Sequence, residues 1–350
     1  MKMKSYLLIL PAVAILFSGA AVAMEPHSSQ RGKPGVGNYD RVLDSEFSLY
    51  YLPDEEGAAL MTYIKQNEPP LLRKLSVKPE NPGPGDPVAI TAEIYNDPLV
   101  TRSKTLEVTV SYSIDGKETW RELDMADAGD GKNWTAVIPP AGAPATLHFY
   151  FTAMDDAENY YMEVPETDVG WASAEDEDYV NTVSDGNDVY TMVPDNLDIL
   201  SVGVAYDGEL IYVETKVEGE ISGGTVTPFE VNVYSAGFYI PTGRREIGPK
   251  PRYVLEHSQH AQFITFPVIG LLDVEKGLAE IRSADARYYS HKDRLYMRME
   301  KSVLDQHGAD YVRLCFGTAM GLNAMPLAID PKDVTSFINV VFGEHTLDIK

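Results

Sequence analysis

Short runs of alternating apolar and polar residues fill the chain between residues 70 and 166. Val88–Ile94 alternates in this way, and Leu106–Tyr112 does the same before an Asp115-Gly116 turn. A period of two is typical of strands that bury one face. About seven such runs, separated by Gly, Pro and Asp turns, predict a β-sandwich over residues 70–166.

A second set of strand-like runs begins at residue 197. Residues 198–205 and 210–217 flank an Asp207-Gly208 turn, which predicts a hairpin. Residues 301–307 have the pattern of one or two helical turns. Further strand-like runs continue to the end of the chain at residues 229–239, 263–268, 286–289, 294–299, 311–318 and 337–342. We therefore expect a second β-sandwich over residues 197–350.

The remaining segments have other patterns. Residues 24–69 form a lead-in, in which the acids of Asp54–Glu56 precede an apolar stretch typical of a short helix. Residues 167–196 are rich in acids and predict a solvated linker. The fold class predicted for the whole chain is mainly β, with two tandem β-sandwich domains and a short N-terminal helical lead-in.

Charge narrows the classes of partner. The 350 residues include 29 basic and 53 acidic ones, giving a net charge of -24. Nucleic acid and anionic lipid surfaces attract clustered Lys and Arg, so this balance disfavours both. The single cysteine, Cys315, lies in an apolar strand-like run, and we expect an inert core thiol. With no internal disulfide, the domains depend on their hydrophobic cores.

The first 23 residues resemble a cleaved export signal. Lys2 and Lys4 precede an apolar run from Tyr6 to Phe17, and Ala21-Val22-Ala23 is a small-x-small cleavage site. An uncleaved membrane anchor is the alternative, but the run is short for a span and contains Pro11. We expect cleavage after Ala23 and an extracytoplasmic location: periplasm, cell surface or secreted.

Residues 70–166 resemble bacterial immunoglobulin-like or fibronectin type III-like domains. The resemblance rests on Pro87–Ala92, on Trp120 after an Asp-Gly-Lys turn, on Trp134–Pro139, and on Phe149–Ala153 with Asp155–Asn159. The cysteine pair of antibody domains is missing. The resemblance implies a spacer or adhesion module.

The 198–217 hairpin resembles those of carbohydrate-binding family 9, DOMON-like and glucodextranase C-terminal-like sandwiches. The shared features are an Asp-led strand, a short turn and a return strand with a Tyr212-Val213 core. The resemblance implies sugar binding or, in some DOMON domains, haem binding. Two departures stand against it: no tryptophan follows Trp171, and no Met/His pair for haem is evident.

Tyrosines of the second predicted sandwich are candidates for a sugar-stacking surface. An aromatic ring packs on the apolar face of a pyranose, while polar groups bond its hydroxyls. The alternative is ordinary strand packing, because strands use tyrosine freely. The candidate ligand-binding residues are Tyr239, Tyr253, Tyr288, Tyr289 and Tyr296.

Metal sites have weaker candidates. Calcium prefers oxygen ligands, and the acidic linker offers Asp176, Asp178, Asp185 and Asp188, although their spacing does not match an EF-hand. No other cofactor is expected. His257 and His260 would share a helix face, but their flanks predict a loop instead of a metal site. Met297 and Met299 could suit copper or haem, but core packing is the favoured interpretation.

Motifs for catalysis are missing from the sequence. It has no zinc-protease helix motif, nucleophile elbow or phosphate-binding glycine loop, although a site assembled from distant strands would leave no motif. We therefore expect a secreted, non-catalytic protein that binds carbohydrate through its C-terminal sandwich. The alternatives are a cell-surface or periplasmic structural protein that docks a protein partner, and a haem- or metal-carrying DOMON-like domain.

Overall fold

A computed structural model describes a mainly β protein, as the sequence predicts. The described residues are 68–167, 181–184, 194–221, 230–241, 251–262, 264–273, 279–280, 287–291, 293–322, 325–335 and 337–350. The predicted signal segment, the 54–64 helix and the four aspartates proposed for calcium lie outside them. One short helix, α5 (Ser302–Asp305), occurs in the described part, inside the 301–307 segment predicted to be helical.

In the first sandwich, a four-stranded sheet packs against one end of a longer sheet. The four-stranded sheet has the order β1 (Leu71–Lys78), β2 (Val88–Tyr95), β6 (Asn133–Ile138) and β5 (Ala126–Asp127). The facing strands are β3 (Thr105–Ser113), β4 (Arg121–Asp124), β7 (Ala145–Asp155), β8 (Tyr160–Val164) and β21 (His345–Ile349). Alternate residues of β2 are fully buried, so the predicted period of two is confirmed there.

In the second sandwich, a five-stranded sheet packs against the other end of the long sheet. The five-stranded sheet has the order β16 (Arg287–His291), β17 (Arg294–Glu300), β11 (Leu210–Val217), β10 (Ile199–Tyr206) and β9 (Asn181–Ser184). The opposing strands of the long sheet are β12 (Glu230–Tyr239), β13 (Tyr253–Gln262), β14 (Ile264–Asp273), β15 (Ala279–Glu280), β18 (Val312–Leu322), β19 (Met325–Val334) and β20 (Ile338–Phe342). Strand β9 falls within the segment predicted to be a linker.

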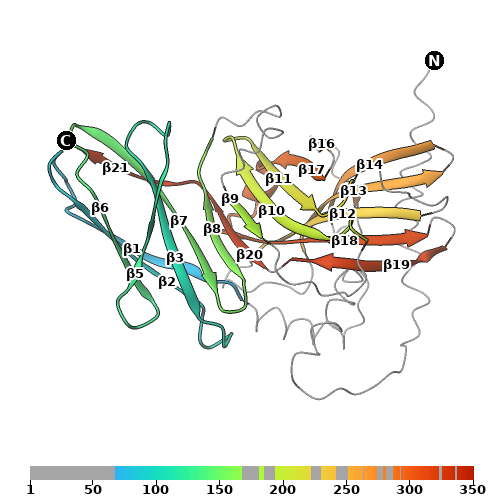
Figure 1. Cartoon of the computed structure of the whole chain (residues 1–350), viewed down its shortest axis with the longest axis horizontal. Coiled ribbons are helices and arrows are strands. Elements are labelled where there is room, and N and C mark those ends of the chain that lie inside the picture. Colours follow the sequence, from blue (N-terminus) through green and yellow to red (C-terminus); the bar gives the residue numbers. More distant parts are fainter. Residues whose placement is uncertain are drawn as a thin grey trace.

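The long sheet runs through both sandwiches without a break (Figure 1). Strand β20 joins its two ends: it pairs antiparallel with β18 and parallel with β8. Strand β21 then pairs with β7, so the last strand of the chain lies in the first sandwich. The sequence placed all of residues 197–350 in the second sandwich, because its pattern does not show which distant strand an edge will pair with.

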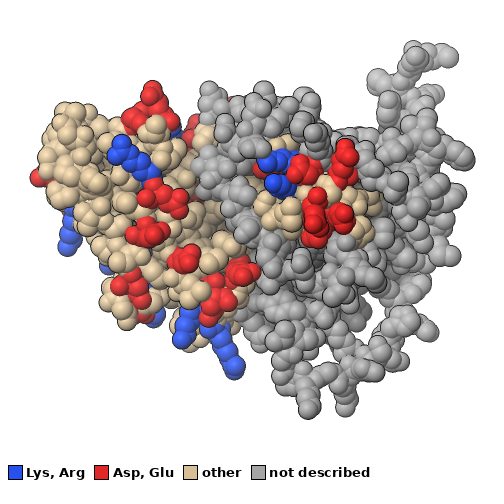
Figure 2. Space-filling model, in the orientation of Figure 1, with Lys and Arg blue, Asp and Glu red and all other residues tan. Residues whose placement is uncertain are grey.

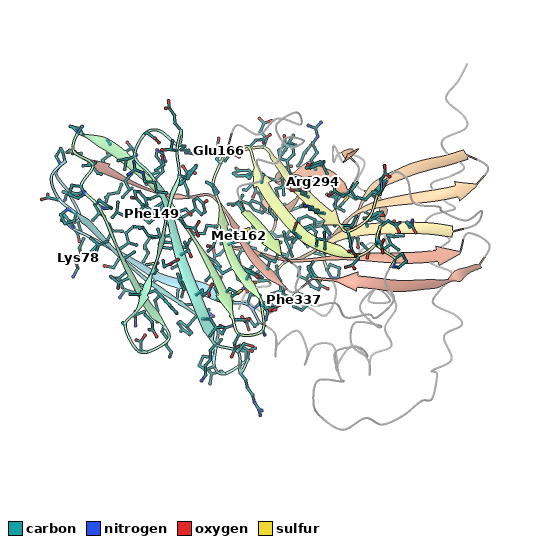
Figure 3. All side chains as sticks on the ribbon, viewed as in Figure 1. Lys78, Phe149, Met162, Glu166, Arg294 and Phe337 are labelled. Atoms are coloured by element: carbon teal, nitrogen blue, oxygen red, sulfur yellow. The ribbon has the colours of Figure 1, made fainter. Side chains whose placement is uncertain are left out.

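The central strands of the long sheet belong to both hydrophobic cores. On β8, Tyr161 packs in the first core, while Met162 and Val164 pack in the second. On β20, Val340 packs in the second core and Val341 against the first. The two smaller sheets therefore cover opposite faces of the long sheet. Figure 3 shows Phe149 in the first sandwich and Arg294 in the second, with Met162 between them.

Buried polar contacts hold this shared region in one geometry. Arg313, almost fully buried, donates from Nε to Oδ1 of Asn339 over 3.0 Å. Asn339 Nδ2 donates in turn to the carbonyl oxygen of Pro70 over 3.1 Å, at the entry to β1. Burial lowers the pKa of Arg313, and the Phe337 ring packs beside its guanidinium. Because a buried polar network is costly to break, we expect the sandwiches to behave as one rigid body.

Candidate binding faces

Three of the five candidate tyrosines are buried. Tyr239 and Tyr253 each expose 2% of their surface, and Tyr296 exposes none. The Tyr253 hydroxyl lies 2.8 Å from Nε2 of His307, and Tyr239 packs edge-on against Phe337. Residues packed in this way present no ring to a sugar, so they do not form the expected stacking surface.

Tyr288 and Tyr289 lie in β16, where they stand opposite Met297 and Tyr296 of β17. Only their backbone is described. Their ligand role stays a prediction.

The histidine pair lies in a strand, so the expectation of a loop was wrong. His257 and His260 are both in β13, where positions three apart do not share a face. His257 is fully buried and stacks on Tyr234, with ring centroids 5.9 Å apart. Met297 and Met299 are fully buried in the second core, as the packing interpretation predicts. Cys315 lies in β18 and is half-buried.

Within the described ranges, no group of three or more His, Cys, Asp or Glu side chains is placed to hold a metal ion. The same part of the chain contains no helix long and apolar enough to cross a bilayer.

An aromatic pair lies on the outer face of the first sandwich. Trp120 meets Tyr150 edge-on, with ring centroids 4.9 Å apart. Tyr150 points outward from β7, because its neighbours Phe149 and Phe151 point into the first core. Burial raises the pKa of Tyr150, a hydrogen bond with Ser111 opposes the shift, and the charge of Glu122 adds to it. Trp120 itself is half-buried and covers the tyrosine.

The loop before Trp120 is held by its own hydrogen bonds. The Asp115 carboxylate accepts from Ser113 Oγ over 2.6 Å, and from the Thr119 backbone N–H over 3.0 Å and the Thr119 hydroxyl. These bonds, from Ser113 first and then Thr119, hold the pKa of Asp115 well below its usual range. Gly116 and Lys117 have φ values of 73° and 72°, and residues 114–120 separate β3 from β4, so the connection is longer than the tight Asp115-Gly116 turn that the sequence predicts. The loop therefore presents Trp120 from a fixed frame.

An ion cluster lies beside the aromatic pair, where the two sandwiches meet. Glu344 Oε1 lies 2.6 Å from Lys117 Nζ and 2.9 Å from His148 Nδ1. Lys117 Nζ also donates to the carbonyl oxygen of Glu166 over 3.1 Å (Glu166 is labelled in Figure 3). His148 and Tyr150 are two residues apart on β7, so they share its outer face. The cluster ties the Trp120 loop to the turn between β20 and β21.

Exposed carboxylates lie to one side of the pair. Glu122 of β4 stands opposite Ser111, which in turn stands opposite Tyr150, while Asp124 and Glu107 lie further along β4 and β3 on the same face. Figure 2 shows acidic side chains scattered over the visible face of the described half. We call the Trp120–Tyr150 pair with these three carboxylates the aromatic-acidic face. Sequence reasoning cited Trp120 only as a mark of fold, because nothing local shows that Tyr150, thirty positions on, packs beneath it.

Comparisons with known proteins identify no family. No family model and no curated protein match the chain. Similar solved structures include the FN1–FN3 domains of chicken CNTN1, with 10% identity and a TM-score of 0.20, covering 79% of this chain and 68% of that one. The adhesin InvE of Yersinia pseudotuberculosis has 10% identity and a TM-score of 0.16; the match covers 80% of this chain but only 60% of InvE.

The collagen adhesin CNA of S. aureus has 5% identity and a TM-score of 0.18, covering 81% of this chain and 96% of that one. These are distant likenesses to immunoglobulin- and FN3-like β-sandwich proteins. At such TM-scores they carry no argument about function.

Proposed function

We propose that this chain is an extracytoplasmic, non-catalytic interaction protein that docks a basic protein partner of the cell envelope on its aromatic-acidic face. The observation that carries the proposal is the Trp120–Tyr150 pair, which lies over β7 on a face that also carries exposed carboxylates on β3 and β4. Tryptophan and tyrosine are enriched among the residues that dominate binding energy at protein interfaces.

Charge defines the kind of partner. Glu107, Glu122 and Asp124 are exposed on the same face as the aromatic pair, on its β3–β4 side, and the chain carries a net charge of -24. Such a field steers a basic surface toward this face and repels an acidic one. A partner with Lys and Arg around an apolar centre has the matching chemistry.

Architecture also favours a docking role. The sandwiches share one sheet, and buried Arg313 and Asn339 link them where they meet. A rigid body holds a docking face at a fixed distance from whatever its other end contacts, and it loses little conformational entropy on binding. Sugar binding by the second sandwich has less support, because Tyr239, Tyr253 and Tyr296 are buried. The extracytoplasmic location rests on the predicted export signal.

Site-specific photo-crosslinking tests the proposal. A photoreactive residue replaces Glu122 on the aromatic-acidic face or, as a control, Leu200, which is 41% exposed on β10 of the second sandwich. We expect position 122 to crosslink a basic protein in cell envelopes and position 200 to give none.

The partner identified by crosslinking is then purified, and its affinity for the wild-type chain and for two variants is measured. Trp120→Ala should weaken binding by at least about 2 kcal/mol, roughly 30-fold, as for a central interface tryptophan. Leu200→Ala should leave affinity and thermal stability unchanged. Equal crosslinking at both positions, or full affinity in Trp120→Ala, would contradict the proposal.

A further inference from the structure

The opposite face of the first sandwich carries a basic patch. On β1, Leu72, Leu75 and Val77 pack toward the core, so Lys74 and Lys78 point outward. Arg73 lies at the irregularity in the β1–β2 register. Figure 3 labels Lys78 at the end of the molecule remote from the second sandwich.

Two of these cations converge on one ring. The Arg73 guanidinium lies 5.5 Å from the centroid of the Tyr95 ring, and Lys132 Nζ lies 5.0 Å from it. Tyr95 ends β2, where it stands opposite Leu71 of β1. Arg73, Lys74, Lys78, Lys132 and Tyr95 together make what we call the basic patch.

Within the described ranges, none of the four cations of the patch makes an ion pair. Glu93 stands opposite Lys74 in the β1–β2 register and shares the outward face of β2 with Tyr95, so the patch includes one carboxylate. Elsewhere in the described chain Lys117, Arg252, Arg294 and Lys301 each pair with an acid. In a sequence with 53 acids and 29 bases, the patch is distinguished by four cations that lie together on one face of the sheet.

Physical chemistry indicates what would complete the patch. The quadrupole of one ring replaces only part of the interaction that each cation would have with an anion. An anionic group beside Tyr95 would form a charge-assisted hydrogen bond with the Arg73 guanidinium or the Lys132 ammonium. Arg73 Nε is buried without a hydrogen-bond partner in the described part of the chain.

We propose that the basic patch binds an acidic polysaccharide, with one carboxylate beside Tyr95, paired to Arg73 or Lys132, and another along β1 at Lys74 and Lys78. An extended strand spaces its outward residues along a line, which suits a linear polymer better than a single ion. Insertion of this face into a membrane has little support, because a single large apolar side chain is exposed among the described outward positions of β2 and β6, that of Val137. Base stacking would need an open aromatic face, and cations lie over Tyr95.

Binding of polygalacturonate to the purified protein tests this inference, with neutral dextran as the control polymer. At low salt, about 20 mM, we expect binding to polygalacturonate, none to dextran, and weakening as salt increases. An Arg73→Gln/Lys132→Gln double variant should lose at least tenfold in affinity. Arg102→Gln/Lys104→Gln, which removes two exposed cations from the loop before β3, should bind like the wild type.

Three outcomes would overturn the inference. They are equal loss in both double variants, equal binding of dextran, and binding to anionic phospholipid vesicles with none to polygalacturonate. A matching thermal transition in both double variants excludes unfolding as the cause of any loss. Trp120→Ala should keep full polygalacturonate affinity, so failure of the proposed docking face and failure of this patch are distinguishable.

Discussion

The two sandwiches treat their outer faces differently. In the first, outward positions such as Thr91 and Thr135 of the four-stranded sheet are partly exposed and Val137 is 57% exposed. In the second, outward positions at the centre of the five-stranded sheet are buried: Tyr212 exposes 2% and Tyr296 none, while Lys216 and Arg298 further along the strands are half-buried. The same strand alternation therefore leaves the middle of the outer face more covered in the second sandwich than in the first.

The difference locates the surfaces open to partners. The aromatic-acidic face and the basic patch lie on opposite sides of the first sandwich, each one sheet away from a shared core. In the second sandwich, Glu214 is buried beside Arg294, its carboxylate 3.2 Å from the guanidinium. Burial raises the pKa of Glu214, and the Arg294 charge opposes this. Because the buried Glu214 is paired with Arg294, this pair is more readily explained as part of the packing than as a site for a ligand.

The strongest test removes a core side chain from one sandwich. Phe151 is fully buried in the first core, so Phe151→Ala should cost about 3–5 kcal/mol in free energy of unfolding. Because the sandwiches share β8 and β20, we expect a single urea unfolding transition. Phe151→Ala should lower its midpoint by the same amount whether unfolding is followed by tryptophan fluorescence or by circular dichroism. Val137→Ala on the same sandwich should change stability by less than about 0.5 kcal/mol. A second transition unmoved by Phe151→Ala would show that the sandwiches unfold independently.

A buried carboxyl tests the outer face of the long sheet in the second sandwich. Glu256 of β13 is 6% exposed, and burial raises its pKa to about 7. Because its folded-state pKa exceeds its unfolded value, stability should fall as the pH rises from about 4.5 to about 7.

Glu256→Gln should remove that fall, and above pH 7 it should exceed the wild type by roughly 3 kcal/mol at most. Thermal melts of both proteins at pH 4.5 and pH 8 measure the difference. Parallel pH profiles would mean that Glu256 is solvated.

The smallest effect concerns the last strand of the chain. Strands β8 and β21 pair with neighbouring stretches of β7. Where they meet, the carboxylate of Glu163 on β8 accepts from the Phe151 N–H of β7 over 3.0 Å and lies 3.1 Å from Nε2 of His345 on β21. Burial lowers the pKa of His345, but the hydrogen bond and charge of Glu163 outweigh burial, so the pKa is raised. The protonated His345 therefore contributes to the free energy of unfolding. That contribution is full below the unfolded-state pKa of about 6.5 and is lost as the pH rises through the raised folded-state pKa.

Glu163→Gln should lower stability by about 1–3 kcal/mol, because it removes a charged acceptor from a buried site. It should also abolish the His345 pH dependence, which at a partly exposed pair is worth less than about 1 kcal/mol. Hydrogen exchange of the β21 amides at pH 6 and pH 8 would report the change locally. Unchanged protection in the variant would assign the docking of β21 to backbone pairing alone.

Local pattern was enough for the strands but not for their partners. Alternation at Val88–Ile94 and the Asp207-Gly208 turn predicted elements that the structure contains, because both depend on neighbouring residues. The same reasoning put His257 in a loop, because its apolar flanks looked like the ends of two strands, whereas β13 continues through the polar residues between them. It also selected Tyr253 and Tyr296 for ligand contact, because residue type alone does not show which face is covered.

By itself, the sequence determined the fold class, the strand positions, the acidic character and the expectation of export, since composition and short-range periodicity carry this information. Tertiary structure alone decided that β20 joins both sandwiches, that β21 returns to the first, and that Trp120 packs on Tyr150. It also gathered Arg73 and Lys132 over Tyr95 in a chain of net charge -24. The physical reason is that strand pairing and face burial are long-range contacts, fixed by how whole sheets pack and not by the residues adjacent in the chain.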